Sequence, residues 1–567
     1  MVRQLLNKLR KREPYTEAAL RLEQADTFKW DHTVDLVIAG FGGAGAACAL
    51  EAEEQGLDTL VLDRFAGGGA TIISGGIYYA GGGTPIQQQA GVEDDPDNMF
   101  NYLKQEVRGA VSDETLKQFC EQSVDNFNWM TDNGVPFDAS FCPFKTSYPP
   151  NSYYFYYSGN ESFPPYSDHA RPAARGHRAH KKGVSGQAIF EPLRDAAKRK
   201  GLKIQSQTKV VGLITNQHDD VIGIKAITLD HNPLARALHR LLGWLHIATR
   251  YPALYCPPLF QLFALTSEAL ERRCGHSVFI RARRGVVLAT GGFYANQTMI
   301  DQHAPQYSGG SPLGTLTDDG SGIKLALQLD AATDLMDSVS CWRFLNPPLT
   351  FVNGILVGPS GQRICNEMLY GAQVGDQMMK HHDGKAWLIL DEKHYKQAYS
   401  DLTLKKGLWF HIMLGLFYMK LGYKKAPGIR GLASKLGIDP KALQDTLDNY
   451  NRIANSDEPD PHGKPKDYMP ALEQGPFFAI NASYDYYWVP GPSLTLGGLK
   501  VDEQSGQVLR NNGEKINGLY AIGRTAVGIA SRGYVSGLSI ADCIFSGRRA
   551  ARHAASEQVK QSLDKTA

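Results

Sequence analysis

The sequence lacks the features that would place it outside the ordinary globular proteins. Its 60 basic and 58 acidic residues leave a formal net charge of +2, so no general attraction to nucleic acid is expected. The eight cysteines are scattered, with no Cys-x-x-Cys pair and no zinc-ligand spacing to histidine. We therefore expect no nucleic-acid partner, no disulfide framework, no metal site and a cytoplasmic location.

A secretory leader and a long apolar run are also missing. The first 20 residues, MVRQLLNKLRKREPYTEAAL, have neither an apolar core nor a cleavage site. They predict a terminal helix, either solvated or in contact with anionic lipid. At 567 residues the chain is too long for one core, so two or three domains are expected. Its 58 glycines fall in clusters, and each cluster needs a local explanation.

The clearest cluster opens residues 34–64, VDLVIAGFGGAGAACALEAEEQGLDTLVLDR, which predict strand, turn, helix and strand. Gly40, Gly42 and Gly45 form the pattern G-x-G-x-x-G. The first glycine permits the tight turn, and the second lets the backbone approach a pyrophosphate closely. The third lets the helix pack closely against the strand. The helix N-terminus would face the phosphates. Asp63 follows at the distance suited to a ribose diol. The segment predicts a dinucleotide site in a Rossmann-like α/β domain.

A second glycine-rich stretch, RFAGGGATIISGGIYYAGGGT at residues 64–84, favours FAD over NAD. Only a flavin needs backbone close to both pyrophosphate and isoalloxazine. GVVLATGGF at 285–293 and INGLYAIGR at 516–524 are further buried strands that end in glycine. We therefore expect one FAD domain, residues 31–295 and 470–555, with an α+β catalytic domain, residues 296–469, inserted in it.

The order of these motifs resembles the flavoprotein family that contains fumarate reductase and the 3-ketosteroid dehydrogenases. The shared pieces are GFGGAGAACALEA, GGGATIISGG, ATGGF, TDDGSGIKLALQLDA, TLGGLKVD and GLYAIGR, spread over residues 34–551. The resemblance implies FAD, although Asp63 stands where the family more often has Glu. No His or Cys stands in a recognisable attachment motif, so we expect the FAD to be bound non-covalently. The implied cofactor residues are Gly40, Gly42, Gly43, Ala44, Gly45, Asp63, Arg64, Gly69, Ala70, Thr71, Ser74, Gly75, Gly76, Val211, Thr290, Gly291, Gly292, Asp319, Gly523, Arg524, Ser539 and Ile540.

Two short motifs are similar to the branch that forms the 4-ene from 5α-3-ketosteroids. RGYVSG at 532–537 has that branch's Gly-Tyr-x-Ser-Gly loop, and GQRICNEMLYG at 361–371 has its second tyrosine. The resemblance implies that Tyr534, Ser536 and Tyr370 are catalytic. Fumarate reductases have a His before the TLGG motif, and PSLTLGGL has none. The Tyr-Pro-Gly-Pro-Gly loop of the 1-ene branch is also absent.

The expected reaction removes two hydrogens beside a ketone, one as a proton and one as a hydride to FAD. Tyr534 would take the proton, with Ser536 on the same face of an extended loop. An ordinary tyrosine pKa is about 10, so neighbours are expected to lower it. Steroid substrate and an external electron acceptor are the expected partners. A 1-ene-forming dehydrogenase and a flavin-dependent reductase remain alternatives, and the oligomeric state stays open.

Two apolar segments predict contact with a membrane surface. In the insertion, residues 231–275, helical periodicity separates two faces. One face carries Leu234, Leu238, Leu241, Leu242, Leu245 and Ala248, and the other carries Arg236, His239, Arg240, His246 and Arg250. Residues 405–425, KKGLWFHIMLGLFYMKLGYKK, have an apolar stretch shorter than the roughly 20 residues of a span.

We expect peripheral contact with the inner face of the cytoplasmic membrane, and flavin binding that survives deletion of residues 233–273. A packed hairpin or a subunit interface is the alternative. Two further segments have plainer interpretations. Residues 168–183, rich in His and Arg, predict a solvated basic loop. The aromatic run at 152–159 predicts either pocket lining or packing.

Overall fold

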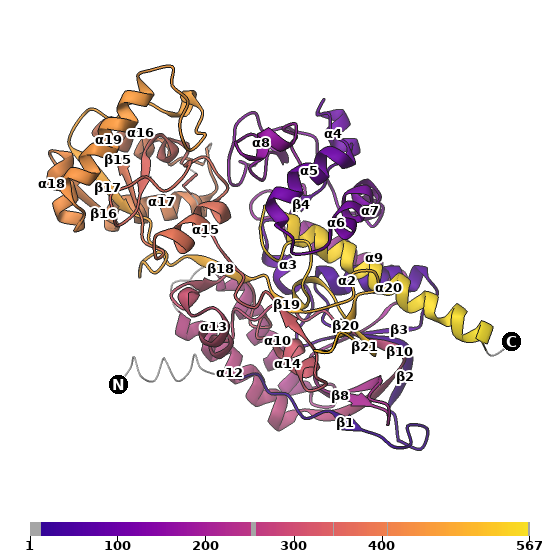
Figure 1. The fold of residues 1–567 in the computed structure, drawn as a ribbon. Coiled ribbons are helices and arrows are strands. Elements are labelled where there is room, and N and C mark those ends of the chain that lie inside the picture. The colour runs from indigo at the N-terminus through magenta and orange to yellow at the C-terminus, as the bar shows by residue number, and fades with distance from the viewer. Residues whose placement is uncertain (1–12, 251–256, 344, 347, 405, 565–567) are drawn as a thin grey trace.

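The computed structural model describes residues 13–250, 257–343, 345–346, 348–404 and 406–564 (Figure 1). The expected terminal helix falls largely on residues 1–12, outside this part. The described residues form a mixed α/β protein with two lobes. The lobe at the upper left of Figure 1 contains the orange segments, and the other contains the large sheet and both ends of the chain.

The large sheet has nine strands in the order β1-β8-β9-β10-β2-β3-β7, with β21 beside β10 and β20 beside β21. Their bounds are β1 (Leu20–Arg21), β2 (His32–Ala39), β3 (Thr59–Asp63), β7 (Lys203–Ser206), β8 (Thr208–Thr215), β9 (Val221–Thr228), β10 (His276–Leu288), β20 (Gln507–Leu509) and β21 (Lys515–Ala521). In β10, Val286 pairs in parallel with Val37 on one side and Leu519 on the other. One sheet thus joins segments from both ends of the chain.

Helix α2 (Gly43–Glu54) connects β2 to β3, as the glycine fingerprint predicted. The long C-terminal helix α20 (Leu538–Asp564), yellow in Figure 1, packs against α2. A Cβ at Gly547 would lie 2.7 Å from the carbonyl oxygen of Ala44, so glycine is required for this close approach. Helix α9 (Gln187–Arg199) contributes to the same core.

A third layer follows β3 in the chain. It comprises α3 (Gly69–Ile73), β4 (Ile77–Tyr79), α4 (Pro85–Gln89), α5 (Pro96–Val107), α6 (Asp113–Glu121), α7 (Ser123–Asp132), β5 (Phe155–Tyr156), α8 (Tyr166–His169) and β6 (Gly176–Arg178). Arg175, just before β6, and Arg178, within it, are fully buried, so the solvated-loop interpretation of residues 168–183 is wrong there. Arg175 forms an ion pair with Asp94 (2.7 Å), and Arg178 donates to backbone carbonyls, including that of Gly183 (2.7 Å).

The second lobe is built on a four-stranded antiparallel sheet in the order β14-β15-β17-β16. Its strands are β14 (Ile355–Val357), β15 (Trp387–Leu390), β16 (Tyr423–Ala426) and β17 (Phe477–Asn481). Its helices are α15 (Gly371–His381), α16 (Glu392–Asp401), α17 (Trp409–Leu421), α18 (Ile429–Leu436) and α19 (Pro440–Ala454). Because β17 belongs to this sheet, the lobe extends past the expected boundary at residue 469.

Smaller elements lie along the chain between these parts. They are α13 (Gln297–His303), β11 (Ser311–Pro312), α14 (Ser321–Leu327), β12 (Thr333–Asp334), β13 (Val339–Cys341), β18 (Pro492–Thr495) and β19 (Gly498–Leu499). The described residues of the insertion include helices α10 (Pro233–Ala248) and α12 (Pro257–Cys274), between β9 and β10. In the described part of the chain, helices fall short of the length and hydropathy that crossing a bilayer requires.

Candidate active site

A cavity of about 640 Å³ extends from the turn after β2 to helix α17 of the second lobe. The predicted cofactor residues on its wall are Gly40, Gly42, Gly43, Ala44, Asp63, Arg64, Gly69, Ala70, Thr71, Ser74, Gly75, Gly76, Thr290, Gly291, Asp319, Gly523, Arg524, Ser539 and Ile540. Segments that are hundreds of residues apart therefore line one cavity.

Three predicted cofactor residues are not on this wall. Gly45 supports the turn, because a Cβ there would lie 1.9 Å from the carbonyl oxygen of the first fingerprint glycine. Val211 is fully buried in β8, and the preceding residues, 208–210, line the cavity instead. At Gly292 a Cβ would lie 2.3 Å from the hydroxyl of Thr495. These residues pack behind the wall.

The turn after β2 suits a pyrophosphate. Gly40 has a φ of 111°, in the left-handed region, and a Cβ there would lie 2.4 Å from the carbonyl oxygen of Ala289. At Gly42 the nearest protein atom would be 3.8 Å from a Cβ, so packing does not demand glycine. The missing side chain leaves the wall open. Helix α2 has no side-chain cap and no acidic residue in its first turn, which favours an anion at its N-terminus.

The Asp63 carboxylate holds the surrounding loop as well as facing the cavity. One oxygen accepts from the backbone N–H of Phe41 (2.9 Å), and the other from those of Phe65 (2.8 Å) and Gly67 (3.1 Å). A carboxylate has about four acceptor positions. One position therefore stays available for a ribose hydroxyl, as expected for this end of FAD.

Arg64 connects the cavity to the insertion. Its guanidinium donates to both oxygens of Glu271 on α12 (2.7 and 3.1 Å), and a third nitrogen contacts Asp319 (3.4 Å). His239 on α10 also contacts Glu271 (2.9 Å). Burial alone would raise the pKa of Glu271, but Arg64 and His239 lower it to about 2. The insertion thus fixes part of the cofactor wall, so its expected independence from flavin binding is no longer supported.

The other end of the cofactor cradle carries positive charge. One nitrogen of Arg524 contacts both carboxylate oxygens of Asp318 (2.8 and 2.9 Å). Its Nη1 is buried, with no hydrogen-bond partner among the described residues. Helix α20 begins at Leu538, next to cavity residues Ser539 and Ile540. A free guanidinium N–H and a helix N-terminus fit the anionic charge of a reduced flavin.

The three predicted catalytic residues meet on this cavity. Tyr534 and Ser536 come from the loop before α20, and Tyr370 comes from the residue before α15 in the second lobe. The ring of Trp342 lies beside both tyrosines, with centroids 5.3 Å from Tyr534 and 6.2 Å from Tyr370. Sequence reasoning missed Trp342, because no motif or spacing marks it.

The aromatic run at 152–159 supports the catalytic loop from behind. The hydroxyl of Tyr156 donates to that of Ser536 (3.4 Å), and the hydroxyl of Ser158 donates to the backbone carbonyl of Ser536 (3.1 Å). Tyr156 is fully buried. The sequence left open whether this run lines the pocket or packs behind it, and these contacts are packing contacts.

Burial sets the protonation of the catalytic tyrosines. Burial raises the pKa of Tyr534 well above its usual value, and the charge of Arg524 offsets only part of this. Burial also raises the pKa of Tyr370, although a hydrogen bond with Ser536 lowers it slightly. Arg524 and Ser536 thus act in the expected direction, but burial outweighs them, and the pKa of both tyrosines is raised rather than lowered. Both hydroxyls are protonated donors at neutral pH.

The wall near Trp342 is apolar where fumarate reductases have cationic groups. The backbone N–H of Trp342 donates to the carbonyl of Pro492 (2.9 Å), and Pro492 and Leu494 both line the cavity. Arg532 is exposed and does not line it. This end of the cavity suits a flat apolar ketone better than a dicarboxylate.

Helix α17 supplies the far rim of the cavity, through Trp409, His411, Met413, Leu414 and Phe417. The side chains of Trp409 and Met413 are about half exposed (55% and 51%). One helix therefore contributes both to the cavity and to the outer surface.

Comparison with known proteins shows the family of this chain. Residues 35–537 match the family model described as an FAD binding domain. The 3-oxo-5-alpha-steroid 4-dehydrogenase of Comamonas testosteroni is 35% identical over 509 residues, which cover 89% of this chain and 95% of that protein. A 3-oxosteroid 1-dehydrogenase of Mycolicibacterium smegmatis is 26% identical over 556 residues, 88% of this chain and 93% of that protein.

A solved structure shows the same architecture. The 3-ketosteroid-Δ4-(5α)-dehydrogenase from Rhodococcus jostii, in complex with 4-androstene-3,17-dione, matches with a TM-score of 0.78 and 32% identity. The match covers 95% of this chain and 100% of that chain. The chain therefore belongs to the FAD-binding flavoprotein family that includes the 3-ketosteroid dehydrogenases, and it is an FAD-dependent oxidoreductase.

Proposed function

We propose that this protein oxidises a 5α-3-ketosteroid to the 4-ene-3-ketosteroid. The observation that carries this proposal is the meeting of Tyr534, Ser536 and Tyr370 on an apolar cavity wall beside Trp342. These residues match the tyrosine–serine pattern of the 4-ene-forming branch. The 35% identity to a 4-dehydrogenase, against 26% to a 1-dehydrogenase, supports the same bond.

The residues of the cavity wall explain how the substrate carbon beside the ketone would lose its proton. A tyrosine hydroxyl that donates to the ketone oxygen makes the neighbouring C–H more acidic by stabilising the enolate. When bound, FAD supplies an acceptor for the hydride that leaves the next carbon. Tyr534 is protonated at rest, so it can take the substrate proton only while passing its own proton on. The hydroxyls of Tyr156 and Tyr370 both bond to that of Ser536, and this group of hydroxyls would accept the released proton.

An external electron acceptor must then reoxidise the reduced cofactor. The substrate also needs a route into the cavity, and a steroid ketone partitions into lipid. We therefore propose that the apolar helices of the protein rest on a membrane, with the inner face of the cytoplasmic membrane as its location.

Helix α10 supports this part of the proposal. It exposes an apolar stripe to solvent, formed by Leu234 (80% exposed), Leu238, Leu241 and Trp244 (62% exposed). His239 and His246, from the polar face of the helix, are buried. A helix that turns leucine outward and histidine inward would suit an apolar partner other than water.

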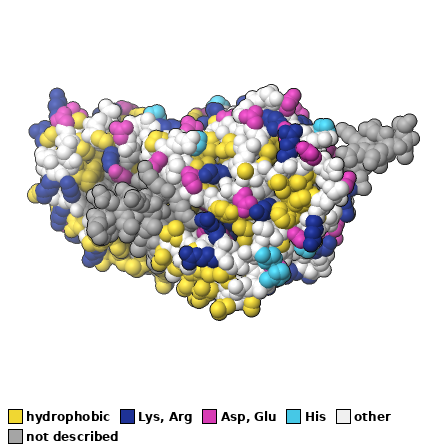
Figure 2. Space-filling view, turned by 90° about the horizontal axis from the view of Figure 1, so that it is seen from below, with side chains coloured by type: hydrophobic (Ala, Val, Ile, Leu, Met, Phe, Trp, Pro, Cys, Tyr) yellow, Lys and Arg dark blue, Asp and Glu magenta, His cyan; other side chains and the backbone are white. Residues whose placement is uncertain are grey.

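Helix α17 carries a second stripe of this kind, formed by Trp409, Met413, Phe417 and Leu421. Three of these residues also line the cavity. Figure 2 shows hydrophobic side chains gathered along the lower edge of the molecule, with Lys and Arg beside them. An apolar surface with a basic border fits an anionic bilayer, and it would open the cavity toward lipid.

The reaction is tested with purified, FAD-loaded protein and an artificial electron acceptor. One sample receives a 5α-3-ketosteroid and a second receives the matching 4-ene-3-ketosteroid. Turnover of the first alone, with the 4-ene as product, is expected. Turnover of the 4-ene substrate would identify a 1-ene-forming enzyme. Product formation only from reduced flavin and an enone would identify a reductase.

A further inference from the structure

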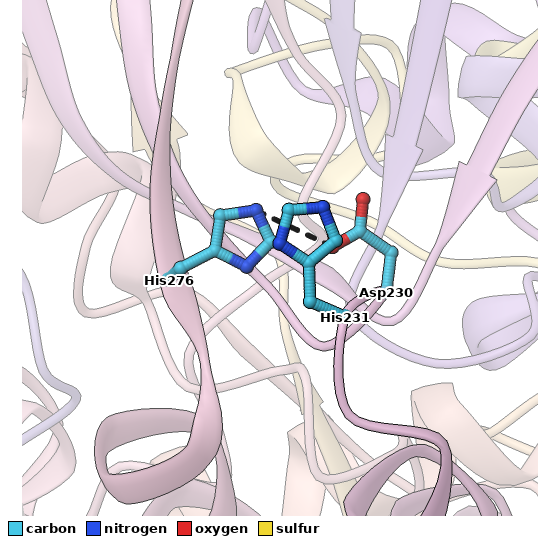
Figure 3. A group of neighbouring side chains, drawn as sticks. All are labelled: Asp230, His231 and His276. Carbon is cyan, nitrogen blue, oxygen red and sulfur yellow. Dashed lines mark ion pairs between the residues drawn. The ribbon is translucent and has the colours of Figure 1, made fainter.

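Three side chains with metal-binding groups meet where the insertion leaves the large sheet. Asp230 and His231 follow β9, and His276 opens β10 (Figure 3). Thr228 of β9 pairs with His276 in the antiparallel ladder, so the two strand ends are held side by side. Helix α10 begins near this point, and helix α12 ends near it. The cluster therefore lies at the base of the insertion, and its three residues do not line the cavity.

The ligand atoms are close to the spacing of a tetrahedral site. All three residues offer atoms within 4.8 Å of one another. An oxygen of Asp230 lies 3.3 Å from Nε2 of His276 and 3.9 Å from Nε2 of His231. Tetrahedral zinc with bonds of about 2.0–2.2 Å separates its ligand atoms by roughly 3.3–3.5 Å. The Asp230–His276 pair already has this separation, and the Asp230–His231 pair must close by about half an ångström. The two histidine nitrogens lie within 4.8 Å of each other and must also converge.

The two imidazole rings are stacked, with centroids 3.9 Å apart and planes 6° from parallel. Binding one ion requires one ring to turn so that both nitrogens converge. The side chain of His231 is 78% exposed, so it can turn without displacing packed neighbours. The carboxylate of Asp230 is 40% exposed, and its ion-pair partners among the described residues are these two histidines.

We propose that Asp230, His231 and His276 bind one zinc-class transition-metal ion, with water as the fourth ligand. Two imidazoles and one carboxylate suit zinc, nickel or copper, whereas magnesium and calcium take six or more oxygen ligands. The ion joins residues on both ends of the insertion. It fastens the base of the hairpin whose helix α12 holds Arg64 at the cofactor wall.

The test uses the FAD-loaded protein, without a histidine tag and after dialysis against a chelator. Zinc chloride is titrated by calorimetry. One site per chain is expected in the wild type. His231→Ala and His276→Ala should each weaken binding by about tenfold or more, at least the loss typical of removing an outer-shell partner. His218→Ala, an exposed histidine on the β8–β9 turn, serves as the matched control.

Flavin absorbance and thermal unfolding without zinc verify that each variant is folded. In the wild type, zinc should also slow tryptic cleavage at the arginines of α10 and α12, and it should not do so in His276→Ala. Wild type without a zinc site would overturn the proposal. So would equal affinity in wild type and both histidine variants, which would put the ion elsewhere.

Discussion

The hydroxyl group of Tyr534 bears a proton in the resting protein, because burial opposes the charge of a tyrosinate. In the proposed reaction it would give up this proton as it takes one from the substrate. Ser536 has a supporting position, since it connects Tyr534's loop to Tyr156. Tyr370 reaches the same wall from the other lobe.

Tyr534→Phe should keep the ring and its packing while removing both the donor and the proton acceptor. We expect flavin reduction by a 5α-3-ketosteroid to fall by about 10²- to 10⁴-fold, the range for a positioned acid or base. Ser536→Ala should lose less, and Tyr370→Phe should fall between them. The measurement is anaerobic stopped-flow bleaching of the flavin.

Tyr487→Phe is the matched control for this series, because Tyr487 is 80% exposed and outside the cavity wall. All variants should retain the flavin spectrum. Bleaching of Tyr534→Phe at the wild-type rate would remove Tyr534 from the proton path and leave Tyr370 as the remaining tyrosine of the group.

The buried carboxyl group of Glu106 leads to a second prediction at the residue scale. Burial raises its pKa to about 7, although hydrogen bonds from Asn160 and Tyr102 act in the opposite direction. An ordinary carboxyl has lost its proton at that pH. Between pH 4.5 and 7 the folded state therefore holds a proton that the unfolded state has released. Raising the pH through this window lowers the free energy of unfolding.

Glu106→Gln should remove this loss of stability at higher pH, because the amide has no charge to bury. We expect the difference in melting temperature, variant minus wild type, to be larger at pH 8 than at pH 5. The expected difference in unfolding free energy is on the order of 1–3 kcal/mol. The same relative melting temperature at both pH values would show that Glu106 ionises normally.

At the scale of elements, the insertion connects the surface to the cofactor wall. The outer side of α10 is apolar, while the inner sides of α10 and α12 carry His239 and Glu271 toward Arg64. Arg64 thus depends on a segment that is far away in the sequence. A change in the position of α12 would therefore move Arg64 and alter the wall that faces the cofactor.

Glu271→Gln should weaken FAD binding without abolishing folding, because Arg64 loses the charge that orients it. We expect the dissociation constant for FAD, measured by fluorescence on reconstituting apoprotein, to rise about tenfold, or about 1.4 kcal/mol. Glu367→Gln is the matched control, since it breaks a comparable buried pair with Arg363 in the other lobe. Equal FAD affinity in wild type and Glu271→Gln would contradict the coupling.

The sequence predicted the elements whose chemistry is local. Gly40, Gly42 and Asp63 belong to one short unit, so their spacing alone locates the phosphate and ribose ends. Trp342 could not be found in this way, because its role arises from contacts with Tyr534 and Tyr370 across two lobes. Periodicity likewise gave two faces for α10, but it could not tell which face the rest of the protein would cover.

At the scale of the whole molecule, the apolar stripes of α10 and α17 determine how the protein would meet a bilayer. Wild type should float with vesicles that contain anionic lipid. A variant with Leu234→Ser, Trp244→Ser and Trp409→Ser should stay in the soluble fraction, because three large exposed apolar side chains are removed. Liposome flotation measures both.

Leu327→Ser is the control for flotation, since Leu327 is an exposed leucine on α14 (45%). Light scattering on the same samples gives the oligomeric state. If wild type does not float but forms a dimer that the triple variant cannot form, the stripes make a subunit interface. Recovery of both proteins as monomers in the soluble fraction would exclude both functions.

The pairing of β10 with strands from both ends of the chain affects how the protein can be made. β2 and β10 leave the ribosome long before β21, which begins at Lys515. At about 5–20 residues per second, roughly 11–45 s of synthesis separate the end of β10 at Leu288 from the start of β21. During that time one edge of the sheet has no partner, and an open edge can pair with other chains. Slow translation or early termination should therefore favour aggregation of this protein before its cofactor domain can close.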